Sequence, residues 1–113
     1  MSVEKINSPE RMLVPMYSHA VKIPGLIFCS GQTPMDSAGN VVPGDIKAHT
    51  ATAGSSWDKV VKVNIYLKSM GDYPAVNEEY IKLIPDPKPA RTCIQAGGLP
   101  WDVDIEIEAI AAV

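Results

Sequence analysis

The sequence is poor in cysteine, in aromatic residues and in positive charge. Cys29 and Cys93 are the only cysteines among 113 residues, too few for a disulfide framework, and no Cys/His spacing matches a zinc site. No apolar run approaches the roughly 18 residues that a membrane helix needs. Ten Lys and Arg face 13 Asp and Glu, for a formal charge of −3. The basic footprint of a general nucleic-acid binder is therefore missing.

The remaining composition is that of an ordinary globular domain. Hydrophobic residues make up 46% and charged residues 20%, and this length predicts a single domain over residues 1–113. Residues 1–15 mix acidic and basic side chains without an apolar core, which argues against a secretory signal and a transit peptide. We expect a reduced intracellular compartment with free thiols, the cytoplasm first and the mitochondrion as the alternative.

The hydrophobic pattern predicts an α+β fold with helices on one face of a sheet. Residues 60–68 alternate apolar and polar side chains, the period of a strand with one buried face. A helix is expected over 72–84, with Asp72 as its N-cap and Pro85 as its end. Further expected elements are two strands within 20–32 joined by a Pro24-Gly25 turn, a weak helix over 46–53, and strands over 90–96 and 102–113.

Three chemically useful side chains lie on the last two expected strands. Arg91 and Cys93 are two residues apart and so share one face of their strand. If a hairpin pairs Ala96 with Val103, Cys93 lies opposite Glu106, and Arg91 reaches the same patch. Spacing alone favours a surface ion pair between Arg91 and Glu106. The alternative is a site in which Arg91 binds a carboxylate and Glu106 moves a proton.

Several segments together resemble one family, the RidA proteins, which are reactive-intermediate imine deaminases also called YjgF or L-PSP proteins. The strongest resemblance is in the C-terminal third, and the N-terminal half and the second helix agree with it. The matching segments are Pro89–Cys93, Leu99-Pro100, Val103–Ala111, Tyr17–Val21, Ser30–Pro34, Asp58–Val63 and Asn77–Tyr80.

This resemblance implies a fold, an assembly and a reaction. The fold would be chorismate-mutase-like, a mixed sheet with two helices packed on one face, assembled as a homotrimer with clefts between subunits. The activity would be that of a 2-iminobutanoate/2-iminopropanoate deaminase in metabolite damage control. Such an enzyme hydrolyses 2-imino acids and enamines, such as 2-aminoacrylate, to 2-keto acids and ammonia. The resemblance implies neither a metal nor an organic cofactor.

The resemblance also assigns roles to seven residues. Arg91 would bind the substrate carboxylate, Glu106 would position water and assist proton transfer, and Cys93 would line the pocket without being an obligatory nucleophile. The others would bind the substrate: Tyr17 closing the cleft from a neighbouring subunit, Ser30 and Gly31 shaping its floor, and Asn77 supporting the site from the helix. An imine is already electrophilic, so fixing the carboxylate and supplying water would suffice.

Two other functions stay open on the sequence. The family resemblance also implies, as an alternative activity, an endoribonuclease acting on single-stranded RNA. The acidic composition and the missing basic stripe argue against this activity. The other is a non-catalytic module that binds small carboxylates or acts as a chaperone-like regulator. Arg91 together with Glu106 favours the deaminase over that module.

The expected first helix is short for this family, which carries about four turns there. The resemblance implies that about a dozen helical residues are missing between Ala53 and Gly54. Residues 45–58 barely suffice for a parallel crossover and offer little apolar surface. We favour a sequence that lacks residues of the natural protein over a true deletion. We predict an intact mass well above 12.2 kDa for the natural protein by mass spectrometry. A mass of 12.2 kDa would instead establish the deletion.

Overall fold

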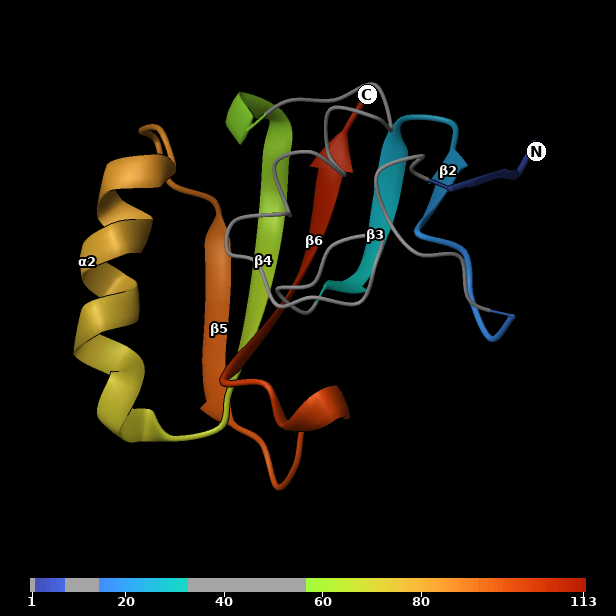
Figure 1. The fold of residues 1–113 in the computed structure, drawn as a ribbon. Coiled ribbons are helices and arrows are strands. Elements are labelled where there is room, and N and C mark those ends of the chain that lie inside the picture. The colour runs from blue at the N-terminus through green and yellow to red at the C-terminus, as the bar shows by residue number, and fades with distance from the viewer. Residues whose placement is uncertain (1, 8–14, 33–56) are drawn as a thin grey trace.

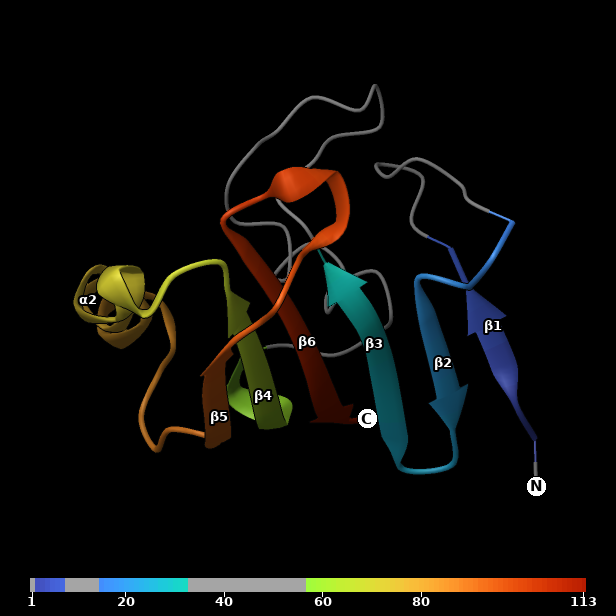
Figure 2. The ribbon, with the colours of Figure 1, turned by 90° about the horizontal axis from the view of Figure 1, so that it is seen from below.

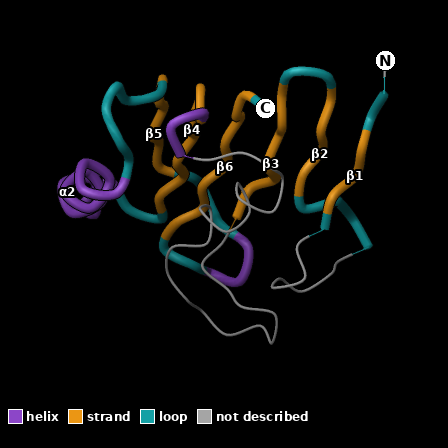
Figure 3. Tube along the Cα trace, turned by 90° about the horizontal axis from the view of Figure 1, so that it is seen from above, coloured by secondary structure: helices purple, strands orange, loops and turns teal. Residues whose placement is uncertain are grey.

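The structure is a computed structural model that describes residues 2–7, 15–32 and 57–113. Its strands form one mixed sheet of six, in the order β1-β2-β3-β6-β4-β5, and Figure 2 shows them side by side. An α-helix, α2 (Tyr73–Leu83), lies along the β5 side of this sheet (Figures 1 and 3). The strands are β1 (Glu4–Ile6), β2 (Ala20–Ile23), β3 (Leu26–Gln32), β4 (Val60–Leu67), β5 (Ala90–Gln95) and β6 (Ile105–Ala112).

The first antiparallel pair is the expected hairpin of β2 and β3. Ile23 pairs with Leu26 around the Pro24-Gly25 turn, and Gly25 adopts a φ of 88°. A left-handed residue of this kind at the second central position suits glycine, while proline fixes the position before it. Strand β1, which the sequence pattern did not predict, adds to the outer edge of β2.

Strand β4, helix α2 and strand β5 form a β-α-β crossover unit at the other edge of the sheet. Strands β4 and β5 are parallel, as expected when a helix connects them. Tyr73, Val76 and Tyr80 pack their side chains against the core. The helical spacing of the apolar residues in 73–84 predicts that Leu83 is buried with them. This is wrong, because Leu83 is 64% exposed, whereas Ile84 just beyond the helix is buried.

The predicted hairpin of the last two strands is wrong. Strand β6 pairs with β3 on one side and β4 on the other, so it never contacts β5 in the sheet. Residues 96–104 instead carry the chain across the end of β4, where Ala96 N–H donates to the Leu67 carbonyl and Lys68 N–H donates to the Asp104 carbonyl. A connection of this length is longer than tight hairpins use, and it allows β6 to insert between β3 and β4.

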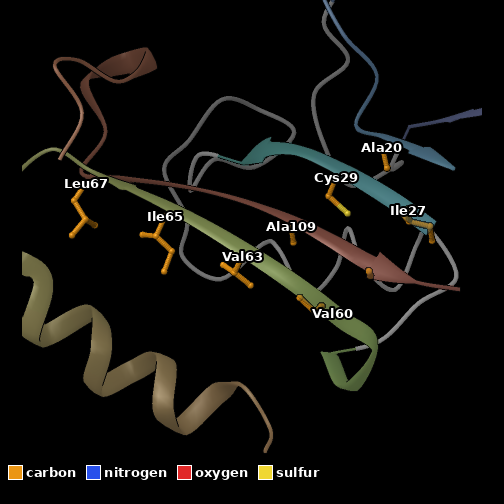
Figure 4. Close-up of a cluster of buried hydrophobic side chains, with 9 residues drawn as sticks. Ala20, Ile27, Cys29, Val60, Val63, Ile65, Leu67 and Ala109 are labelled. Atoms are coloured by element: carbon orange, nitrogen blue, oxygen red, sulfur yellow. The ribbon is translucent and has the colours of Figure 1, made fainter. Parts of the chain in front are cut away.

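The core lies on one face of the sheet. Ile27, Val63, Ile65 and Leu67 are its most completely buried large side chains, and those of β4 point towards the side on which α2 lies (Figure 4). A register shift between Val60 and Lys62 turns Val60 inward and leaves Val61 47% exposed. The strand pattern therefore predicted the buried face correctly from Val63 onward and wrongly at Val61.

Two expectations lie outside the described residues, namely the weak helix over 46–53 and the shortened junction between Ala53 and Gly54. In the part of the chain that the structure describes, no helix has the length and apolar character needed to span a membrane.

The two valines of β4 provide a matched test of this packing. We predict that Val63→Ala lowers the free energy of unfolding by about 2 kcal/mol, because two buried methyl groups are lost and a cavity remains. Val61→Ala removes the same atoms from an exposed position and should cost less than about 0.5 kcal/mol. Urea unfolding of both variants measures the difference, and equal losses would contradict the assigned register.

Candidate active site

The sheet separates the predicted site residues into two groups on opposite faces. In the register of β4 and β5, Arg91 lies beside Val63 and Cys93 beside Ile65, on the core face that α2 covers. In the register of β4 and β6, Glu106 lies beside Tyr66, on the other face. Because neighbours across a sheet point the same way and successive residues alternate, one copy of the chain keeps Arg91 away from Glu106. The predicted single patch and the predicted Arg91–Glu106 ion pair are both wrong.

The Arg91 guanidinium is held by tyrosines of α2. Its Nη2 donates to the Tyr73 hydroxyl at 3.2 Å, and its central carbon lies 5.6 Å from the Tyr73 ring centre and 4.9 Å from that of Tyr80. No carboxylate of the described ranges lies within ion-pair distance of it. The guanidinium therefore keeps an uncompensated charge and free N–H donors, which suit a bidentate carboxylate.

Two polar side-chain atoms of α2 are buried without hydrogen bonds. They are Asn77 Oδ1 and the Tyr80 hydroxyl. Asn77 is four residues after Tyr73 and three before Tyr80, so all three side chains share one face of α2. Buried polar groups normally have partners. An unpaired acceptor and an unpaired hydroxyl on the helix face that holds Arg91 are typical of a site that is completed by a ligand, water or another chain.

Cys93 lies beside this group, and burial raises the pKa of its thiol, with the Arg91 charge opposing the shift. Its side chain packs against the core cluster. A thiol with a raised pKa stays protonated at neutral pH and is a poor nucleophile. Cys93 can thus shape a pocket wall without covalent chemistry.

On the opposite face, Glu106 lies directly against Gly31. A Cβ built on Gly31 would be 2.6 Å from Glu106 Oε1, so only glycine leaves room for the carboxylate in this position. Burial is the largest cause of a raised pKa at Glu106, and the neighbouring Glu108 charge raises it further. A carboxyl group whose pKa is raised in this way holds a proton more readily than a free glutamate, which suits it to proton exchange.

Glu108 is anchored as an acceptor by two side chains of β4. The Tyr66 hydroxyl donates to Glu108 Oε1 at 2.7 Å, and Asn64 Nδ2 donates to the same oxygen at 3.0 Å. The hydrogen bond to Glu108 is the main cause of the raised pKa of Tyr66. The sequence reasoning did not single out this network, although the regular alternation of β4 and β6 aligns its members.

Ser30 ties the Tyr17 segment to the end of β3. Its hydroxyl donates to the Ser18 carbonyl at 2.6 Å, and its backbone N–H donates to the His19 carbonyl at 2.9 Å. Tyr17 precedes these residues with 51% of its surface exposed. Glu106, with Gly31 against it, lies on the face opposite Arg91, and the hydrogen bonds of Ser30 hold the segment after the exposed Tyr17 at this end of β3.

The described residues contain no group of three or more His, Cys, Asp or Glu side chains arranged to hold a metal ion. The sequence reasoning also missed Tyr73 and Tyr80 as partners of Arg91. Their spacing of seven residues in the apolar stripe of α2 was the available signal, since it places both on one helix face, two turns apart.

The mixed sheet with one flanking helix is the architecture of the YjgF, RidA and L-PSP proteins. Residues 9–113 match the family model described as Endoribonuclease L-PSP, and the chain belongs to this family. It is 45% identical over 126 residues to "Protein mmf2, mitochondrial" of Schizosaccharomyces pombe, covering 99% of each chain.

Solved structures agree with this assignment. RidA from the Antarctic bacterium Psychrobacter superposes with a TM-score of 0.90 at 30% identity, covering 97% of this chain and 99% of that one. TdcF of E. coli, solved with bound serine, superposes with a TM-score of 0.83 at 27% identity, covering 97% of this chain and 99% of that one.

The raised pKa of Glu106 predicts a pH-dependent stability. The folded state holds this proton more tightly than the unfolded chain, so ionisation of Glu106 lowers stability as the pH rises from the ordinary glutamate value to the raised one. We predict that Glu106→Gln melts at a higher temperature than the wild type at pH 7. At pH 3 the two should melt together, because the wild-type carboxyl is then protonated as well. Scanning calorimetry at both pH values tests this, and a wild type that is equally stable or more stable at pH 7 would contradict it.

Proposed function

We propose that the chain is a cofactor-independent 2-imino acid deaminase whose active sites form between copies of the chain in a homotrimer. The observation that carries the proposal is the complementary character of its two residue groups. One presents a guanidinium that has no acidic partner among the described residues. The other presents a carboxyl group with a raised pKa. Deamination of an imino acid needs both, one for the substrate carboxylate and one for proton transfer.

The separation of the two groups on opposite faces explains why the proposal needs more than one copy. Within one chain the sheet itself lies between Arg91 and Glu106. A rotational assembly brings one face of each copy against a different face of the next, and closes as a ring. In such a ring, Arg91 and Asn77 of one copy meet Glu106, Gly31 and Tyr17 of the next.

The reaction then follows from the chemistry of these groups. Arg91 binds the carboxylate of the 2-imino acid through its free N–H donors, which fixes the C=N carbon. Glu106 accepts a proton from water as the water oxygen bonds to that carbon, and the C=N bond becomes a C–N single bond. Glu106 gives this proton to the nitrogen, which completes a carbinolamine. Glu106 then takes the hydroxyl proton of the carbinolamine and passes it to the nitrogen as the C=O bond forms and the C–N bond breaks, so that the 2-keto acid and ammonia leave. Cys93 keeps its proton throughout.

Three of the similar proteins support parts of this proposal. TdcF was solved with serine, which carries the carboxylate that Arg91 is proposed to bind, and one solved relative is named RidA. The relative from Schizosaccharomyces pombe is named as mitochondrial, which supports the mitochondrion as the alternative to the cytoplasm.

Loss of the guanidinium tests the proposed reaction directly. A serine dehydratase generates 2-aminoacrylate, and its disappearance is followed with and without the protein. We predict that wild type speeds the loss and that Arg91→Ala lowers this rate by about 100-fold, because a bidentate charged contact is removed. Equal rates for the two proteins would overturn the role of Arg91. Cleavage of single-stranded RNA by wild type but not by Arg91→Ala, without imine hydrolysis, would favour the endoribonuclease instead.

Gly31 provides a test of the other group. We predict that Gly31→Ala lowers the imine deaminase rate by about 10- to 100-fold, because its methyl group displaces the Glu106 carboxylate from its position. The melting temperature should change little, since the group that must move is the end of a flexible side chain. Gly97→Ala is the matched control, because a Cβ there meets nothing within 4 Å. Full activity of Gly31→Ala would contradict the placement of Glu106.

A further inference from the structure

The guanidinium of Arg91 lies among aromatic groups rather than acidic ones. Its central carbon is 4.9 Å from the Tyr80 ring centre and 5.6 Å from the Tyr73 ring centre, both within the range of a cation–π interaction. The Tyr73 hydroxyl also accepts a hydrogen bond from Nη2 at 3.2 Å. These contacts define what we call the tyrosine clamp, formed by Tyr73 and Tyr80 around Arg91.

The tyrosine clamp orders the Arg91 side chain without neutralising its charge, which an ion pair would do. A carboxylate partner would neutralise the guanidinium and occupy two of its donors, so a substrate would have to displace it. Two tyrosine rings and one hydroxyl restrict the long side chain of Arg91 while leaving its charge and most of its N–H groups available. The arginine is therefore ordered before the ligand arrives, which lowers the entropic cost of binding.

The clamp is built into the connection between β4 and β5. Tyr73 begins α2 and Tyr80 lies two turns further on, on the same face, and both rings also pack against the core. Arg91 is the second residue of β5, which α2 leads into. The packing that fixes α2 thus also fixes the arginine.

We propose that Tyr73 and Tyr80 are positioning residues that hold Arg91 ready for a carboxylate ligand, an inference that rests on the proposed deaminase function. The substrate carboxylate keeps its charge through the reaction, so the clamp stabilises the bound substrate and the transition state equally. Its loss should therefore raise KM and weaken carboxylate binding while leaving kcat nearly unchanged.

The binding test uses 2-oxobutanoate, a keto acid product of the proposed reaction, titrated calorimetrically into the intact assembled protein. We expect Kd to rise about 3- to 30-fold in Tyr80→Leu, which removes a ring from the guanidinium. Tyr73→Phe removes the hydroxyl alone and should raise Kd about threefold. Tyr80→Phe keeps a ring in place and should recover most of the affinity. Ile81→Ala, an exposed position of the same helix, serves as the control for helix integrity.

A double-mutant cycle separates positioning from direct contact. In the Arg91→Ala background, Tyr80→Leu and Tyr73→Phe should change Kd by less than about twofold, because they act through the missing guanidinium. The same loss of affinity with and without Arg91 would overturn the proposal. So would a fall in kcat at unchanged KM in Tyr80→Leu.

A spectroscopic measurement distinguishes failure of the clamp from failure of the proposed function. In wild type, NMR signals of the Arg91 guanidinium should be shifted upfield by the tyrosine ring currents and should move to ordinary positions in Tyr80→Leu. The test remains valid if Tyr80→Leu folds poorly, because the upfield shift of the Arg91 signals is measured in wild type itself. If wild type neither deaminates imines nor binds 2-oxobutanoate but shows the shift, the deaminase fails and the clamp holds Arg91 for another anion. Ordinary guanidinium signals in wild type would overturn the clamp.

Discussion

The insertion of β6 between β3 and β4 is the constraint on which the rest of the structure depends. It places Glu106 beside Tyr66 and against Gly31, and it leaves Arg91 on the outermost strand, under α2. Since side chains alternate between the two faces of a sheet, this strand order decides which candidate residues can cooperate within one chain. Arg91, Cys93 and Asn77 form one group, and Glu106, Gly31 and Ser30 form another. The proposed intersubunit site is a direct consequence of that division.

In each group the surroundings adjust the charge of one side chain, the guanidinium of Arg91 in one and the carboxyl group of Glu106 in the other. Arg91 is ordered by aromatic contacts, and within the described part of the chain no acidic side chain neutralises its charge. Glu106 experiences the opposite tuning, because burial and the charge of Glu108 both disfavour its ionised form. Glu108 in turn accepts hydrogen bonds from Tyr66 and Asn64. The two groups therefore differ in sign and in chemistry, one suited to hold an anion and the other to exchange a proton.

Local patterns predicted most of the elements but not their arrangement. The strand within 60–68, the Pro24-Gly25 turn and the helix after Asp72 follow from short-range chemistry, and the structure confirms them, although the alternation of β4 is correct only from Val63 onward. The strand order depends on which strand inserts beside which, and no short-range signal in 96–104 states that β6 passes to the far side of β4. The expected hairpin of the last two strands failed for this reason, and with it the single patch of Arg91, Cys93 and Glu106. Motif resemblance selected the family correctly, whereas the tyrosine contacts of Arg91 required the packing of α2.

Complementation between inactive variants tests the central claim most directly, namely that each active site takes Arg91 from one copy and Glu106 from the next. Arg91→Ala and Glu106→Gln are each purified, shown to be inactive on 2-aminoacrylate, then unfolded together at equal concentration and refolded. In a closed ring with random mixing, about a quarter of the interfaces combine an intact Arg91 with an intact Glu106. If each site takes Arg91 from one copy and Glu106 from the next, the refolded mixture should recover about a quarter of the wild-type rate. A refolded, mixed assembly that stays as inactive as its parents would contradict it.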